Sequence, residues 1–505
     1  MELLNTVISW LMKKRIHQIE LFLKYPHEVQ REWLKKLLYT ARGTEWGLKY
    51  NFRTIGTPEQ FRERLPVQDY EEVKPYIDRL KLGDQNILWP TEIKCYAKSS
   101  GTMNEKSKFI PVSEEALEEC HFKGGKDLLS IYCNNHPSTN LFGGKAIGMG
   151  GTQQMVEVNN DSIYYQGDLS AILMQNLPLW VELLRTPNLS IALMDDWEVK
   201  IEKMAQATIA QNVTNISGVP SWTLLLFRRV LEIAGKENLL DIWPNFELFI
   251  HGGVSFSPYV DQFKKLLPSG KVNYLETYNA SEGFFAIQDR QHSDELLLML
   301  DYGIYYEFIP ADNISSAEYK TLTLDEVEPD VNYALVITTN AGLWRYLVGD
   351  TVMFTSVNPY RIKITGRTRS FINAFGEELI VDNADKALSI ACARCMATIA
   401  EYTAAPVYLK RDQRGAHEWL IEFETPPADL AFFTEILDNA LKSLNSDYEA
   451  KRYHNMLLGE PIIRPMLAGT FYRWLKSKGK LGGQNKVPRL FNDRKYVDEI
   501  LKMIF

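Results

Sequence analysis

The sequence predicts an α/β protein with a large N-terminal domain of mixed sheets, helices and a β subdomain, followed by a smaller α+β C-terminal domain. In the first half, helical spacing of apolar residues alternates with short strands, and a block of strand-like segments follows at 246–357. Beyond Gly366-Arg367 a pattern of loop, helix and strands begins again. We therefore expect one domain at 1–366 and a second at 367–505.

The expected elements follow the chain in order. Residues 1–40 and 169–240 have helical spacing, and the segments at 92–98 and 108–113 predict two strands around a polar loop. The remaining elements are strands at 246–250, 271–277, 283–288, 296–309, 333–339 and 353–357, a helix at 382–400, strands at 405–410 and 418–423, and a helix at 428–443.

Composition excludes several classes of protein. The 505 residues are 45% hydrophobic and 24% charged, and the net charge of −8 argues against a nucleic-acid surface. At the N-terminus an apolar run precedes the basic residues, unlike a signal peptide, and no run approaches the length of a membrane span. Five cysteines make no disulfide framework, and Cys392 and Cys395 lie in an apolar helical pattern. A cytoplasmic enzyme without a membrane or nucleic-acid partner is expected.

The first chemical motif is the loop Ser99-Ser100-Gly101-Thr102, which is followed by Lys108. Hydroxyls, backbone N–H groups and a nearby cation suit phosphate oxygens, and the glycine lets the backbone come close. The spacing is not that of a P-loop. An ordinary polar turn remains the alternative.

Two further motifs follow strands. Gly252-Gly253 comes after a buried strand, where glycines permit close approach of a planar ligand. Tyr278 ends the next strand and could stack on a base, with Ser281 and Glu282 directly after it. A carboxylate at such a turn suits Mg²⁺, which takes few carboxylates and is shared with phosphate. A plain turn and a solvated glutamate remain the alternatives.

Three motifs lie further along the chain. Asp350, in Arg-Tyr-Leu-Val-Gly-Asp, could accept hydrogen bonds from both hydroxyls of a ribose. Arg367 stands at the expected domain boundary. The glycine-rich basic segment 480–489 has the composition of a mobile loop that could deliver a lysine, Lys486 or Lys480, to a phosphate. A common turn and a solvated basic loop remain the alternatives.

The order of these motifs resembles the adenylate-forming superfamily of acyl-CoA synthetases, luciferases and adenylation domains. More specifically, it resembles the auxin-responsive-promoter family of acyl-acid amido synthetases, whose motifs read S-S-G-T-[ST]-x-G-x-x-K, Y-x-x-S-E and Y-R-Y-x-x-G-D. The resemblance runs along most of the chain. Three positions depart from the family pattern: Met103, Glu105 and Trp344.

The resemblance implies a large N-terminal domain with a small C-terminal lid on a hinge, and it implies ATP and Mg²⁺ as cofactors. It assigns Lys486, Glu282 and Lys108 to catalysis, with Glu282 as the Mg²⁺ ligand. The implied ATP-binding residues are Ser99, Ser100, Gly101, Thr102, Gly253, Tyr278, Ser281, Asp350 and Arg367.

The implied reaction activates a small carboxylic acid as an acyl-AMP and transfers the acyl group to the amine of an amino acid. Transfer to coenzyme A, and a nucleotide-binding protein without catalysis, are the two alternatives. His251 is the histidine nearest to the expected adenine site, and we expect it to be structural or nucleotide-facing. Two segments, 120–132 and 149–156, could line the acyl pocket, and the sequence does not decide between them. It assigns no general base or oligomeric state.

Overall fold

The computed structural model describes residues 15–99, 108–159, 162–253, 256, 259–314, 320–368, 371–372, 374–375, 377, 379–408, 415–445, 448–449, 452, 458–479, 486–491 and 493–503. The chain forms two compact units, each described by itself below. The first comprises Met1–Gly253, Leu266–Val348 and Val352–Lys363, and the second comprises Val254–Lys265, Gly349–Thr351 and Ile364–Phe505. The division at 366–367 stays a prediction.

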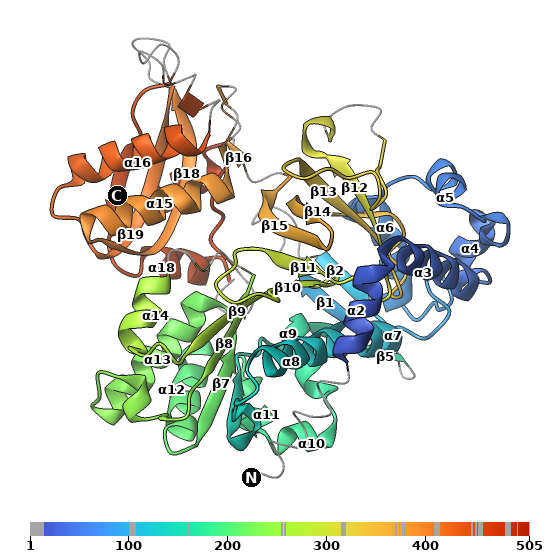
Figure 1. The fold of residues 1–505 in the computed structure, drawn as a ribbon, viewed down its shortest axis with the longest axis horizontal. Helices are drawn as coiled ribbons and strands as arrows, with labels where there is room; N and C mark the ends of the chain where they lie inside the picture. Colours follow the sequence, from blue (N-terminus) through green and yellow to red (C-terminus); the bar gives the residue numbers. More distant parts are fainter. Residues whose placement is uncertain are drawn as a thin grey trace. The chain divides into compact units, whose positions relative to one another are not determined.

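Two sheets contain the first fifteen strands (Figure 1). An eleven-stranded sheet has the order β12-β13-β14-β15-β11-β10-β9-β8-β7-β3-β6, and a four-stranded sheet has the order β2-β1-β5-β4. The strand bounds are β1 Cys95–Ser99, β2 Lys108–Val112, β3 Lys145–Gly148, β4 Gln153–Asn159, β5 Ser162–Gly167, β6 Arg185–Thr186, β7 Val213–Ser217, β8 Leu248–Gly252, β9 Asn273–Ala280, β10 Gly283–Ile287, β11 Leu296–Leu298, β12 Ile304–Pro310, β13 Asn332–Thr339, β14 Tyr346–Val357 and β15 Tyr360–Arg367.

Helices flank the parallel part of the large sheet. Helices α12 and α13 lie along one face and α8 along the other (Figure 1). Asp196 caps α12, and Pro220 begins α13, which ends at the left-handed Gly235. The helix bounds in the first unit are α2 Ile16–Lys24, α3 Pro26–Ala41, α4 Glu45–Lys49, α5 Pro58–Arg64, α6 Tyr70–Lys81, α7 Glu114–Ala116, α8 Lys123–Asn135, α9 Leu169–Gln175, α10 Leu179–Glu182, α11 Leu189–Ala192, α12 Trp197–Thr208 and α13 Pro220–Ala234. Helix α14, Val260–Leu266, belongs to the second unit except for its last residue.

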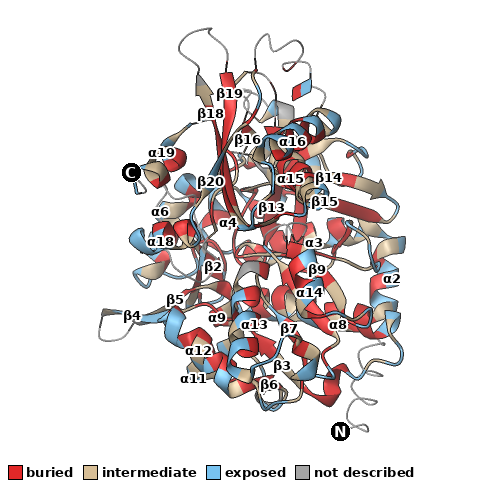
Figure 2. Cartoon of the chain, turned by 90° about the vertical axis from the view of Figure 1, so that its left-hand side faces the viewer, coloured by how far each residue is buried: buried red, intermediate tan, exposed pale blue. Residues whose placement is uncertain are grey.

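The second unit has a sheet of order β18-β19-β20, in which β19 is buried along most of its length (Figure 2). Helices α15 and α16 contribute Leu388 and Leu437 to a core that also contains Trp419. The bounds are β16 Phe371–Ile372, β17 Leu379–Ile380, α15 Val381–Cys395, β18 Thr398–Tyr408, β19 Gly415–Thr425, α16 Leu430–Leu444, β20 Ile462–Met466, α18 Thr470–Ser477 and α19 Lys495–Lys502.

The predicted α/β class is confirmed, and two local predictions differ from the structure. The helix predicted at 382–400 ends at Cys395, because Met396 is left-handed with φ 53°, and β18 begins at Thr398. Strand β7 was missed because polar Thr214 and Asn215 are buried in it, one on each face, so no apolar run marks it.

Candidate active site

The parallel strands end along one edge of the large sheet. Strands β3, β7, β8 and β9 are parallel neighbours, so their carboxyl ends lie side by side. Gly148, Ser217 and Gly252 end the first three strands, and Ser281-Glu282 follows the fourth. In open α/β sheets, ligands bind at this edge. Gly253, Tyr278, Ser281 and Glu282 therefore lie along this edge of the sheet in the first unit, and their roles stay predictions.

The glycines after β8 are required by close packing. A Cβ on Gly252 would lie 2.4 Å from the carbonyl oxygen of Thr277, and Gly253 has φ 81°. The preceding His251 is 4% exposed, and burial lowers its pKa to about 3. The imidazole at this position is therefore neutral and enclosed, and its structural or nucleotide-facing role stays a prediction.

The turn between β9 and β10 consists of Ser281 and Glu282, because Ala280 pairs with Gly283 in the antiparallel register. Ser281 is 5% exposed, whereas Glu282 is half-exposed. The ring of Tyr278 is 5% exposed and lies 4.8 Å from that of Phe285. The turn thus presents the Glu282 carboxylate at the sheet edge.

A buried histidine supports the end of β9. Nδ1 of His121 lies 3.2 Å from Oδ1 of Asn279, and burial lowers the pKa of the histidine to about 4. His121 belongs to the π-helix η2 (Leu117–Phe122), and such π-helical turns are frequent at functional sites. No pattern in the sequence indicates this contact, because it joins two segments that are far apart along the chain.

The predicted phosphate loop connects the paired strands β1 and β2. Ser99 opposes Lys108 across this antiparallel pair. The side chain of Ser99 and the residues Ser100, Gly101 and Thr102 lie outside the described residues, as do Met103 and Glu105. Nζ of Lys108 lies 5.7 Å from the ring centroid of Tyr70, whose hydroxyl accepts a hydrogen bond from the Phe109 amide. The base of the loop is therefore fixed at the start of β2.

In the second unit, Asp350 and Arg367 lie on adjacent backbone segments. Gly349 has φ 92°, and its carbonyl accepts hydrogen bonds from the amide (2.9 Å) and hydroxyl (3.3 Å) of Thr368. Asp350 is half-exposed, and the Arg367 side chain lies outside the described residues. Asp350 and Arg367 are therefore direct chain neighbours of two residues, Gly349 and Thr368, that are hydrogen-bonded to each other.

Lys486 also belongs to the second unit and is half-exposed. The segment after it is anchored to β18: the Ala404 amide donates to the Arg489 carbonyl at 2.8 Å, and the Phe491 amide donates to the Ala404 carbonyl at 3.2 Å. Lys486 is thus the first described residue of an anchored segment, and Lys480 lies outside the described residues.

Comparison with known families accounts for most of the chain. Residues 15–272 match the GH3 family N-terminal domain, 297–367 the GH3 family central domain, and 382–495 the GH3 family C-terminal domain. The chain belongs to the GH3 family. The resemblance to acyl-acid amido synthetases inferred from the motif order is thereby confirmed.

Individual GH3 relatives match along most of their length. The indole-3-acetic acid-amido synthetase GH3.3 of Arabidopsis thaliana is 23% identical, over 91% of this chain and 89% of its own. The 4-substituted benzoates-glutamate ligase GH3.12 of the same plant is 22% identical, over 86% and 88%. The solved GH3.15 acyl acid amido synthetase has a TM-score of 0.77 at 16% identity and covers 97% of this chain and 96% of its own, which shows a shared fold.

The fold extends to another solved enzyme. A 2-hydroxyisobutyryl-CoA ligase in complex with its acyl-AMP has a TM-score of 0.61 at 12% identity, with 94% of this chain and 91% of its own covered.

None of the helices in the described part of the GH3 chain has the length and apolar character needed to cross a bilayer.

One departure from the GH3 motif has a structural explanation. Trp344 is 1% exposed, its Nε1 donates to the Leu88 carbonyl at 3.0 Å, and its ring lies 4.5 Å from that of Phe52. The tryptophan therefore fills a packing position. Its neighbour Arg345, which the sequence left without a role, is 4% exposed and pairs with Glu307.

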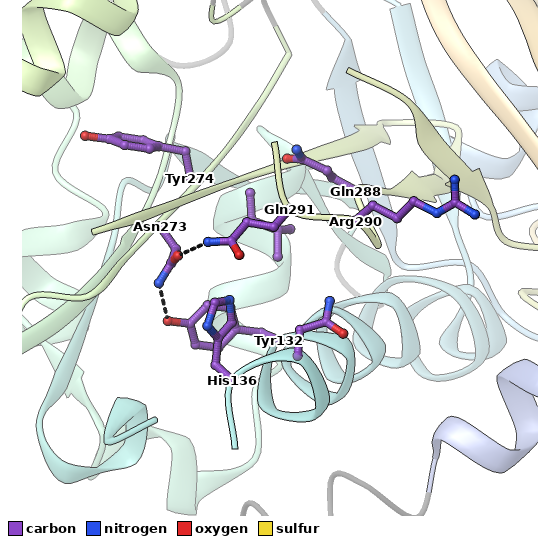
Figure 3. A pocket seen from close by; sticks show the side chains of 9 residues that line it. Tyr132, His136, Asn273, Tyr274, Gln288, Arg290 and Gln291 are labelled. Atoms are coloured by element: carbon purple, nitrogen blue, oxygen red, sulfur yellow. Dashed lines mark hydrogen bonds between the residues drawn. The ribbon is translucent and has the colours of Figure 1, made fainter. Parts of the chain in front are cut away.

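A shallow depression lies away from the predicted motifs of the GH3 chain. Its lining includes Tyr132, Asn135, Asn273 and Gln291 (Figure 3). The amide of Asn273 donates to the Tyr132 hydroxyl at 3.1 Å and accepts from Gln291 at 2.8 Å. Asn273 begins β9, whereas Glu282 follows its last residue, so the depression and Glu282 lie at opposite ends of that strand. The side-chain amides of Asn273 and Gln291 are hydrogen-bonded to each other.

Proposed function

We propose that this GH3 protein activates a small carboxylic acid with ATP as an acyl-AMP and transfers the acyl group to the amine of an amino acid. One observation carries the proposal: Gly253, Tyr278 and Glu282 share one sheet edge in a chain that GH3 domains match along most of its length. The GH3.3 and GH3.12 relatives are named for this type of product.

Each predicted residue takes one role in this proposal. Gly253 and Tyr278 flank adenine, Asp350 holds the ribose with help from Arg367, and Lys486 reaches the α-phosphate. The triphosphate is held by Ser99, Ser100, Gly101, Thr102, Lys108 and Ser281. The strand pairs described above hold the backbone on both sides of Ser281 and the start of β2 at Lys108.

The chemistry explains why cations are needed. A carboxylate attacks an anionic phosphate slowly, because both groups are negatively charged. Lys108 and Lys486 neutralise charge as it moves to the departing pyrophosphate. Glu282 is suited to hold Mg²⁺, since a half-exposed carboxylate in a turn leaves room for water and phosphate ligands. Bound there, Mg²⁺ supplies further charge neutralisation at the phosphates.

The second step requires a free amine and a dry site. The amine arrives largely as an ammonium and must lose a proton before it attacks the mixed anhydride. Glu276, whose pKa is raised to about 7 by burial and by Asp294, is not placed to take that proton. Four residue steps of β9, about 13 Å, lead from Glu276 to Ala280, and the turn that carries Glu282 comes after them. We propose that the C-terminal lid rotates at Gly366-Arg367 between the two steps and excludes water.

The proposed location is the cytoplasm. Cys95, Cys120, Cys392 and Cys395 are free thiols, and burial raises the pKa of Cys392 to about 12. Free, unreactive thiols are typical of proteins in reducing compartments.

Pyrophosphate release tests the function. ATP and Mg²⁺ are supplied with a panel of aromatic and aliphatic acids, each with and without mixed amino acids or coenzyme A. Acid-dependent release with an amide product establishes the proposal, and a thioester product moves the enzyme to the acyl-CoA ligases. Tight ATP binding without release for any acid favours a nucleotide-binding protein.

Glu282→Gln tests the metal assignment within the same assay. The amide keeps the shape of the side chain but removes the charge, so we expect kcat/KM for adenylation to fall at least about 100-fold. Glu295→Gln is the matched control, because Glu295 is also half-exposed and stands just before β11. Wild-type turnover in the Glu282 variant would exclude this residue as the metal ligand.

A further inference from the structure

Lys200, on α12, is buried without a carboxylate at ion-pair distance among the described residues. Its side chain is 0% exposed. Nζ donates to the carbonyl oxygens of Gly150 at 2.7 Å and Gly151 at 3.2 Å, and it lies 4.4 Å from the ring centroid of Trp197. Burying an ammonium costs several kcal/mol. In this protein the buried ammonium of Lys200 lies against the carbonyls of the Gly150–Gly151 turn.

The same turn is held from its other side. The Gly151 amide donates to the hydroxyl of Ser170 at 2.9 Å, and the Thr152 amide donates to Oδ2 of Asp168 at 2.8 Å. The carbonyls therefore face a cation while the amides face a hydroxyl and a carboxylate. Peptide dipoles held between opposite charges in this way have one preferred orientation. The turn is therefore held by the side chains of Lys200, Ser170 and Asp168.

Close packing favours glycine at both positions. A Cβ on Gly151 would lie 1.9 Å from Oδ2 of Asp168, and a Cβ on Gly150 would lie 2.7 Å from the sulfur of Met174. Without side chains of its own, the turn leaves Met174 and the half-exposed Met149 as its apolar neighbours. Methionine adapts to irregular apolar groups. Such a wall suits the body of an organic acid better than a phosphate.

The position of the turn places it at the same sheet edge as the predicted site. The turn follows β3, and the Met149 amide donates to the carbonyl of Ser217 at the end of β7 at 2.9 Å. Gly218 comes so close to Met149 that a Cβ on it would lie 2.7 Å from Cγ. Two strand spacings, about 10 Å, separate β3 from β8. The turn therefore lies beyond Gly253, on the side away from Glu282.

We propose that Lys200 is a positioning residue, which holds the Gly150–Gly151 turn as a wall for the carboxylic acid during adenylation. This inference rests on the proposed function. Lys200 touches no substrate and acts through the turn. Its removal therefore affects the acid, whereas ATP, bound on β8 and β9, is recognised as before.

Lys200→Met tests the inference, because it removes the charge at nearly constant length. In the pyrophosphate assay we expect kcat/KM for the acid to fall about 30-fold, with KM for ATP within about 2-fold of wild type, since small misplacements away from the chemistry can cost up to 100-fold. Ser170→Ala removes the support on the opposite side and should shift the same constants in the same direction. Lys203→Met is the control, because Lys203 is exposed on the same helix.

Equal losses toward ATP and the acid in Lys200→Met, or wild-type constants in both variants, would overturn the inference. If Lys200→Met does not fold, Ser170→Ala decides. Hydrogen exchange of the peptide covering 149–156 is independent of turnover: it should quicken in Lys200→Met but not in Lys203→Met. A wild-type protein that releases no pyrophosphate with any acid, yet shows this exchange pattern, would contradict the proposed function while retaining Lys200 as the support of the turn.

Discussion

Two buried cations of the first unit are held in opposite ways. The guanidinium of Arg345 is paired: Nε and Nη2 each donate to Glu307 at 2.9 Å, and Nη2 also donates to Thr321 at 2.6 Å. The ammonium of Lys200 is held by two carbonyls and an aromatic ring. Both side chains are almost entirely buried, at 4% and 0% exposure.

This difference distinguishes Arg345, whose charge stabilises the fold, from Lys200, whose charge we assign to positioning the proposed site. Arg345 lies between β13 and β14 and has φ 46°. Its guanidinium also donates to the carbonyls of Arg62 and Leu65, so it joins the C-terminal end of α5 to these strands. A bidentate pair offsets the desolvation of both partners. Among the described residues Lys200 has no carboxylate at ion-pair distance, and burial lowers its pKa to about 8. Buried groups with strongly shifted pKa values are more frequent at functional sites than elsewhere.

Arg345→Met should have the largest effect on stability. It leaves the Glu307 carboxylate buried without its cation, which costs about 3–5 kcal/mol of unfolding free energy. Urea unfolding followed by circular dichroism measures the loss. Arg79→Met, at an exposed arginine that pairs with Glu45, should leave the urea midpoint near that of wild type.

The double variant Arg345→Met/Glu307→Met sharpens this prediction. Because it removes both charges together, it should recover part of the stability lost in Arg345→Met. A double variant that is less stable than Arg345→Met would show that the backbone contacts of the guanidinium dominate over the ion pair.

Lys200→Met should reveal the unpaired cation through pH. The folded pKa near 8 lies below the ordinary value of 10.5, chiefly because of burial, with Asp168 and Asp195 opposing the shift. Between these values the unfolded chain retains a proton that the folded chain has released, so wild-type stability rises with pH relative to the variant. The rise amounts to about 3 kcal/mol. Below pH 8 the difference should be constant.

Urea unfolding of wild type and Lys200→Met at half-unit steps from pH 7 to 10 measures this difference, and titrations common to both proteins cancel. A difference that stays flat across the range would mean that Lys200 is solvated or ion-paired in the folded protein, and the contrast with Arg345 would disappear.

These two cations also show what the sequence could reveal. The motif with Tyr278 and Glu282 at the end of an apolar strand indicated the sheet edge where the site is proposed, because motif and strand end are local features. Arg345 and Lys200 gave no such signal. Their partners lie 38 residues away at Glu307 and 50 residues away at Gly150, so their roles depend on tertiary contacts that spacing does not encode.

The α/β class was predicted from the periodicity of apolar residues. The turn after β3 is a feature that this periodicity does not predict. The glycines at 150 and 151 were visible as a segment that could line an acyl pocket. What holds them is a helix and a loop, through Lys200 and Asp168, and no pattern within either segment indicates that they meet. Elements defined by repeating burial are predictable, whereas turns held by single distant side chains are not.

Thr321→Val should have the smallest effect and tests how far the Arg345 pair depends on its third member. The Thr321 hydroxyl donates to Oε1 of Glu307 at 2.7 Å and accepts from Arg345, and the side chain is 2% exposed. Valine keeps the shape and removes both bonds, while the two charges stay paired, so we expect a loss of about 1.5 kcal/mol. The same substitution in the Arg345→Met background should cost less, because one of the two bonds is already gone. An equal cost in both backgrounds would show that Thr321 stabilises Glu307 alone and that the paired cation needs no third partner.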